Sequence, residues 1–171
     1  GMTPQSGVPQ NNRVGDFDPF ALRLVKRLTG KDYDELLDEL ASKGGLLGLS
    51  GVSNDARDIE QAAENGNQQA DYALRVYAAE IKRYIGQYLA VLNGADAIVF
   101  TGGIGENSQR VRQDVCADMD YVGLQLDEAK NKQAKGETKI STDDSRVDIW
   151  IVPTNEEIVV ARQTVATVSS N

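Results

Sequence analysis

The chain has 171 residues, of which 18 are basic and 26 acidic, giving a formal net charge of −8. This length allows one domain with a real core, and the acidic balance without a basic run argues against binding to nucleic acid or to a membrane surface. The absence of histidine excludes Ser-His-Asp and Cys-His catalysis and histidine-ligated metals, so a metal here needs oxygen ligands, as magnesium does.

Apolar periodicity and turn residues predict a helical first part. Proline and glycine residues predict a loop over about the first twenty residues. Asp18 then suits the cap of a helix, and Pro19 suits its first position. In a second helix, Leu36, Leu37 and Leu40 are expected to face inward, and glycines 44 and 45 end it. The helices are expected at about residues 20–28, 31–41, 56–64 and 69–92, with a glycine- and serine-marked loop from Leu46 to the third.

The second part predicts two strands between helices. Residues 97–101 and 147–152 have strand character, a helix is expected near Ser108–Met119, and the lysine-containing region up to Asp144 is expected to be solvated surface. Thr154 and Glu157 form a capping-box pattern for a last helix. Strands separated by helices favour a parallel α/β sheet, but two strands are too few to be stable alone. The sequence therefore predicts a missing portion of the domain or an oligomer that completes it.

The single cysteine, Cys116, lies in the helix expected near Ser108–Met119. It cannot form an internal disulfide, which favours a reducing, cytoplasmic location, and a buried structural thiol is expected. No apolar stretch approaches the roughly 20 residues that cross a bilayer, and no signal peptide is visible.

The most informative segment runs from Asp96 to Arg110. A short apolar strand breaks into glycines 102, 103 and 105, which let a ligand approach the main chain, and Asn107 or Ser108 can cap a following helix. A strand, a glycine turn and a helix N-terminus together point N–H groups at one spot, which suits a phosphate or a nucleotide. The alternative is a tight connection without a ligand.

Arg13 lies in a glycine-punctuated polar loop, residues 11–16. Its guanidinium can bind a phosphoryl or carboxylate group bidentately. The alternative is a surface arginine paired with Asp16 or Asp18.

Polar groups also gather at two expected helix starts. Asp55 can hold a ribose hydroxyl and Arg57 a base or phosphate, although ordinary capping by Ser53 or Asp55 explains the same pattern. Glu156 follows the second strand, where ligands of open α/β sheets bind, and can hold magnesium directly or through water. A capping role accounts for Glu157 better than for Glu156.

Together these segments closely resemble the C-terminal part of acetate kinase. The resemblance extends in family order over nearly the whole chain, to about Thr164. The matching stretches are residues 1–4, 12–19, 51–59, 100–108 and 155–157 with the helix after them.

The resemblance implies an α/β fold, a partial actin-like (ribonuclease-H-like) ATPase domain that is helix-rich with few strands. It also implies transfer of the ATP γ-phosphoryl group to the carboxylate of acetate, giving acetyl phosphate and ADP reversibly, with Mg2+. The implied catalytic residue is Arg13, which stabilises the transferring phosphoryl group, and Glu156 serves the metal. The implied nucleotide contacts are Asp55, Ala56, Arg57, Gly103, Ile104, Gly105, Glu106 and Asn107.

The sequence departs from the family in one respect: the N-terminal half and the phosphate-binding loop of the family have no counterpart in these 171 residues. Residues 1–171 are therefore expected to be an incomplete nucleotide-binding domain, shortened by a truncated gene or a deliberate cut, with little kinase activity alone. The helix at 157–171 is expected to pack on the missing half, which leaves residues 158–160 without a partner. A homodimer, or association with the missing half, is expected. The alternatives are a non-catalytic nucleotide-binding or interaction fragment, and propionate in place of acetate as the substrate.

Overall fold

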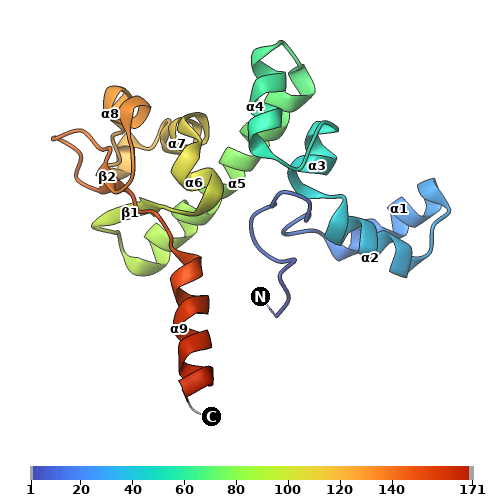
Figure 1. Ribbon diagram of the computed structural model, residues 1–171. Coiled ribbons are helices and arrows are strands. Elements are labelled where there is room, and N and C mark those ends of the chain that lie inside the picture. Colours follow the sequence, from blue (N-terminus) through green and yellow to red (C-terminus); the bar gives the residue numbers. More distant parts are fainter. Residues whose placement is uncertain (1, 170–171) are drawn as a thin grey trace. The chain divides into compact units, whose positions relative to one another are not determined.

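The computed structural model describes residues 2–169, apart from the side chain of Glu156 (Figure 1). Gly1, from the first matching stretch, and residues 170 and 171, from the expected last helix, lie outside the described residues. The chain forms two compact units. The first comprises Gly1–Ala95 with Arg110–Ala117, and the second comprises Asp96–Gln109 with Asp118–Asn171.

The first unit is helical. Asp18 accepts a hydrogen bond from the Phe20 amide and begins the helical part, as the sequence predicts. In the described residues the elements are η1 (Pro19–Ala21), α1 (Leu22–Thr29), α2 (Tyr33–Ser42), α3 (Gly45–Ser50), α4 (Ala56–Glu64), α5 (Gln68–Leu92) and nearly all of α7 (Gln109–Cys116).

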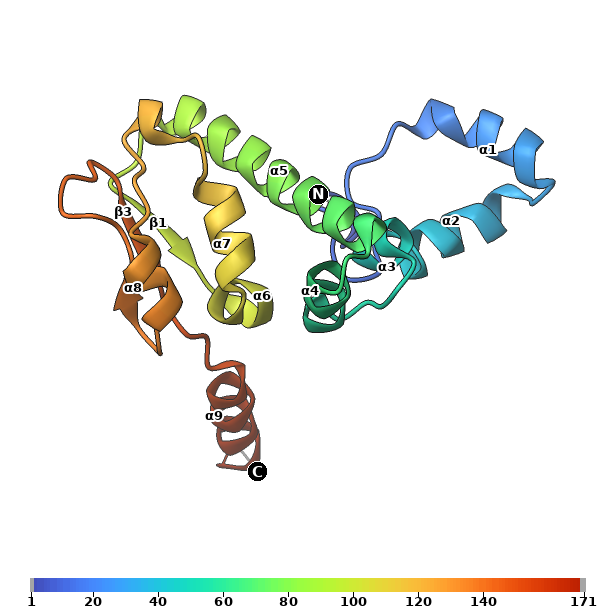
Figure 2. The ribbon, with the colours of Figure 1, turned by 90° about the horizontal axis from the view of Figure 1, so that it is seen from above.

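The core of this unit lies along the first turns of α5. Asn67 caps that helix by accepting from the amides of Gln69 and Ala70. Helices α3 and α4 pack beside it, as Figures 1 and 2 both show. The small alanines allow close approach of the helices, and the larger side chains fill the space between them. The fully buried residues here include Leu46, Ile59, Ala70, Ala73 and Leu74.

Helix α7 contributes to the same unit. Val115 and Cys116 are buried, which confirms the predicted structural thiol. Burial raises the pKa of the Cys116 thiol to about 12, so it is protonated and unreactive at neutral pH. Lys82 of α5 donates to the Ala117 carbonyl at 2.5 Å, and Arg110 forms an ion pair with Asp71.

Two sequence predictions for the first unit are wrong. Leu37 is 50% exposed instead of facing inward, because α2 buries Leu36 and only partly covers Leu40. Residues 46–50, predicted to be loop, belong to α3. That helix begins at Gly45, whose φ of +58° and missing side chain let the backbone approach the Gln10 carbonyl.

The second unit contains a mixed sheet in the order β1-β3-β2. The predicted parallel pair is confirmed: Ala97–Phe100 (β1) runs beside Asp148–Ile151 (β3), with Phe100 opposite Ile151. Strand β2, Thr138–Lys139, adds an antiparallel edge. The other elements described in this unit are α6 (Gly102–Asn107), η2 (Asp120–Val122), α8 (Glu128–Gln133) and α9 (Glu156–Ser169).

The region predicted as solvated surface, up to Asp144, is partly core. Ile140 and Ser141 are fully buried, although Lys130 and Asp143 form an ion pair at the surface. The prediction is wrong there because a two-residue strand leaves no readable alternation. No helix within residues 2–169 is both long enough and apolar enough to cross a membrane.

Candidate functional site

The loop that carries Arg13 is held by backbone hydrogen bonds. Val14 N donates to the Leu40 carbonyl at 2.9 Å, and Gly44 N donates to the Asn12 carbonyl at 2.9 Å. Arg13 itself donates from Nη1 to the Pro4 carbonyl at 3.2 Å. The loop therefore lies between the end of α2 and the start of α3, with the guanidinium near the chain's first turn.

Asp16 is the residue of this loop whose role the sequence did not predict. The sequence offers it as an ion-pair partner of Arg13, but its Oδ2 accepts from Arg83 at 3.2 Å and from the Tyr84 hydroxyl. Its Oδ1 accepts from Gly7 N at 2.8 Å. The Tyr84 hydrogen bond, the Gly7 amide and Arg83 hold the pKa of Asp16 below its ordinary value. Asp16 thus fixes the Arg13 loop to α5.

The start of α4 places Asp55 and Arg57 together. Asp55 is the cap, accepting from the Arg57 amide at 2.9 Å, and its carboxylate also binds the Arg57 guanidinium through Nε at 3.0 Å and Nη2 at 2.5 Å. The Arg57 side chain is 83% exposed. Hydrogen bonds from its side chain and amide lower the pKa of Asp55 to about 2. The capping interpretation is correct for Asp55, while Ser53 accepts from Asp55 N and donates to Asp58.

The glycine segment differs from the predicted open turn. Residues 102–107 form the short helix α6, which begins after Thr101. Of the two expected cap residues, Asn107 is the last residue of α6 and donates from Nδ2 to the Gly103 carbonyl at 2.8 Å, whereas Ser108 directly precedes α7 and occupies its cap position. Gly102 has a φ of +72°, and a Cβ on Gly103 would meet no atom within 4 Å. The backbone at Gly103 is therefore open to a ligand.

Glu106 connects this segment to the end of β3. Its Oε1 accepts from Gly102 N at 2.9 Å, from Thr154 N at 2.9 Å and from Thr154 Oγ1 at 3.1 Å. The Thr154 amide, then the Thr154 hydroxyl and the Gly102 amide, lower the pKa of Glu106. One of the glycine N–H groups expected to face a phosphate is thus already bound to a carboxylate.

At the start of α9, the predicted capping box of Thr154 and Glu157 is wrong, because Thr154 is not the cap residue. Thr154 bonds to Glu106, and it is Asn155 Oδ1 that accepts from Ile158 N, at 3.1 Å. Glu156 is the first residue of α9, and its side chain lies outside the described part of the chain. Because β1 and β3 are parallel neighbours, the glycine segment and the Thr154–Glu156 segment leave the sheet at the same edge.

The predicted site residues thus form separate groups. The second unit brings together Gly103–Asn107 and the segment before Glu156. The first unit holds Arg13 on one loop and Asp55–Arg57 at the start of α4, and no described hydrogen bond joins these two groups. Among the described residues, no cluster of three or more acidic, cysteine or histidine side chains could hold a metal ion.

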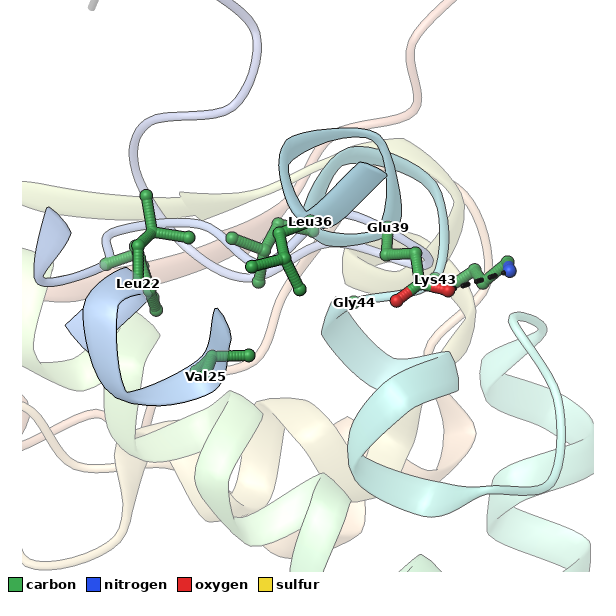
Figure 3. Close-up of a pocket in the computed structure, with 8 residues that line it drawn as sticks. Leu22, Val25, Leu36, Glu39, Lys43 and Gly44 are labelled. Atoms are coloured by element: carbon green, nitrogen blue, oxygen red, sulfur yellow. Dashed lines mark hydrogen bonds and ion pairs between the residues drawn. The ribbon is translucent and has the colours of Figure 1, made fainter. Parts of the chain in front are cut away.

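A pocket of about 290 Å³ lies beside the Arg13 loop and is lined by Val14, Gly15 and Asp16, but not by Arg13 itself. Another, of about 250 Å³, lies between α1 and α2 and is lined by Leu22, Val25 and Leu36, with the Glu39–Lys43 ion pair at 3.1 Å on one side (Figure 3). None of the predicted site residues lines it. Its apolar lining fits packing better than binding of a phosphate.

Comparison with known proteins identifies the family. The model of the acetokinase family matches residues 1–162. The chain belongs to this family. It is 47% identical over 167 residues to the acetate kinase of Chloroherpeton thalassium, covering 96% of this chain and 40% of the relative.

Solved structures of the family share the fold. The Porphyromonas gingivalis acetate kinase superimposes with a TM-score of 0.89 at 41% identity, over 97% of this chain and 42% of that one. A propionate kinase from Francisella tularensis superimposes with a TM-score of 0.86 at 32% identity. The match covers 94% of this chain and 41% of the propionate kinase. The helix-rich α/β, actin-like architecture expected from the sequence is confirmed. The chain spans about two fifths of the length of these relatives.

Proposed function

We propose that this chain is the nucleotide-binding part of an ATP-dependent carboxylate kinase. The observation that carries the proposal is the shared sheet edge, where the glycine segment after β1 and the Thr154–Glu156 segment after β3 leave neighbouring parallel strands. Ligands of open α/β sheets bind beyond such strand ends. The relatives named acetate kinase, and one named propionate kinase, support phosphoryl transfer between ATP and a short carboxylate.

The residues take the roles expected of a phosphoryl-transfer site. The backbone of Gly103–Asn107 and the Asp55–Arg57 group contact ADP or ATP, and Arg13 stabilises the transferring phosphoryl group. Phosphoryl transfer depends mainly on positioning and on neutralising spread negative charge. An exposed guanidinium held bidentately by Asp55 is presented in a fixed orientation, which favours a role for Arg57 in binding nucleotide.

Magnesium fits the donor chemistry at the end of β3. Thr154, Asn155 and Glu156 offer only oxygen ligands, and Mg2+ is typically held by one or two carboxylates together with substrate phosphates. Glu156 would hold it, directly or through water. The ion would neutralise charge on the phosphates during transfer.

The domain organisation belongs to the same proposal. We expect residues 1–171 to be the C-terminal nucleotide-binding portion of the family, and residues 157–171 to pack on the N-terminal part that full-length relatives possess. Exposure of 40%, 52% and 64% at Ile158, Val159 and Val160 shows that the first turns of α9 leave apolar surface uncovered, which supports packing against a partner. Association with that part or with a second copy would cover it. The chain alone is expected to show little acetate-dependent ADP formation.

Calorimetric titration of the purified chain with ADP and Mg2+ tests the proposal. Binding is expected, and Arg57→Ala is expected to weaken it by about tenfold or more, as loss of a charged contact does. Arg27→Ala, at an exposed arginine of α1, is the matched control. Absence of binding would favour a non-catalytic interaction role, and rapid acetate-dependent turnover by the chain alone would contradict the expected inactivity.

A further inference from the structure

A single carboxylate oxygen joins two segments that are 48 residues apart in sequence. Glu106 Oε1 accepts hydrogen bonds from the Gly102 amide and from both the amide and the hydroxyl of Thr154, all between 2.9 and 3.1 Å. Hydrogen bonds to an ionised carboxylate are stronger than neutral ones. The contact therefore fixes the start of α6 against the end of β3.

The two joined segments carry different proposed ligands. Gly102 precedes the backbone that is open at Gly103, where the nucleotide is expected. Thr154 comes two residues before Glu156, the expected magnesium ligand. Glu106 is thus a hydrogen-bonded link between the two segments.

We propose that Glu106 is a positioning residue that couples nucleotide binding at the glycine segment to magnesium binding at the start of α9. This inference rests on the proposed function, since it needs both ligands to bind in the second unit. Glu106 acts through Gly102 and Thr154, by holding their backbones at a fixed separation. It differs from a direct nucleotide contact, which would affect binding with or without the metal.

The test compares ADP affinity with Mg2+ and with a chelator, by calorimetry on the whole chain. The ratio of the two affinities measures the contribution of the metal. In Glu106→Ala the ratio is expected to fall by about tenfold, to near one, while affinity in chelator changes little. Glu106→Gln keeps an oxygen that accepts the same hydrogen bonds and should retain most of the ratio. Glu128→Ala, at an exposed glutamate in the first turn of α8, is the control and should match the wild type.

Two results would overturn the inference. An unchanged ratio in Glu106→Ala would show that the metal and nucleotide positions do not depend on this contact. Tighter ADP binding in chelator would show that the Glu106 carboxylate instead competes with phosphate for the glycine segment.

Amide hydrogen exchange provides a readout that needs no ligand. In Glu106→Ala the amides of Gly102 and Thr154 should lose protection together. The Ile140 amide, which donates to the Ile149 carbonyl at 2.8 Å, should keep it. Unchanged protection at Thr154 would refute the link itself. Wild-type chain that binds no ADP would instead refute the proposed function and with it the coupling to the metal, while exchange would still decide the link.

Discussion

Replacing Gly103 with alanine should weaken nucleotide binding without destabilising the protein, whereas Gly102→Ala should destabilise it. Both glycines lie in the first turn of α6, and a Cβ on either one would meet no atom within 4 Å. They differ in backbone conformation, because Gly102 has a φ of +72° and Gly103 does not have a positive φ. The pair therefore separates backbone strain from access to the main chain.

The magnitudes follow from these two conformations. An L-residue in the left-handed region costs about 1–2 kcal/mol, which Gly102→Ala would incur. Alanine in a helix is favoured over glycine by roughly 0.5–1 kcal/mol, so Gly103→Ala should be neutral or slightly stabilising. A methyl group in the open space beside Gly103 would hold a phosphate away from the backbone. We expect about a tenfold loss of affinity, equivalent to about 1.4 kcal/mol.

Urea unfolding and ADP calorimetry in the presence of Mg2+ measure the two effects on the same protein samples. Gly103→Ala should unfold at the wild-type urea concentration or slightly above it, and bind ADP more weakly. Wild-type affinity in Gly103→Ala would refute the assignment of this backbone to the nucleotide. Equal loss of stability in the two variants would refute the argument from the positive φ at Gly102.

Further predictions concern charge, reactivity and packing. Because the pKa of Asp55 is about 2 when folded and ordinarily 3.8, its ionised form stabilises the fold above about pH 4, and this contribution is lost as pH falls towards 2. Urea midpoints of wild type and Asp55→Asn should therefore differ at pH 6 and converge near pH 2; a constant difference would contradict this. Cys116, with its thiol pKa raised from 9.0 to about 12, should react with a thiol reagent at pH 8 roughly a thousandfold more slowly than in urea. Leu74→Ala, at a fully buried site, should cost about 2–5 kcal/mol in urea unfolding, whereas Leu92→Ala, 66% exposed on the same helix, should stay within about 0.5 kcal/mol.

Elements with strong local signals could be predicted from the sequence. Helix α4 spans Ala56–Glu64 as expected, because Asp55 caps it and Asn65-Gly66 ends it. Helix α5 begins one residue before the expected Gln69, after the Asn67 cap. In both helices the apolar period and the capping residues indicate the same boundaries, and tertiary packing favours those boundaries too.

The missed elements are short and depend on distant contacts. Helix α3 contains Gly45 and Gly48, and α6 contains three glycines, so helix propensity argues against both. Gly45 is needed because the backbone of the Arg13 loop approaches it closely, a contact between residues more than thirty positions apart. Local patterns contain no information on such an approach, and the same holds for the two-residue strand β2.

The end of β3 shows why the candidate site was only partly predictable. Thr154 and Glu157 satisfy a local capping rule, yet Thr154 bonds to Glu106 and Asn155 takes the cap. The Glu106 carboxylate accepts from both the amide and the hydroxyl of Thr154, and α9 begins only after Asn155, which takes the cap. Asp16 behaves similarly, binding Arg83 and Tyr84 of α5 in preference to its neighbour Arg13. In both places a carboxylate fixes a segment that carries a proposed ligand-binding residue, and this leaves Arg13 without a described carboxylate partner. Long-range carboxylate contacts therefore determine where the proposed ligand-binding groups lie, and sequence motifs determine only which groups are present.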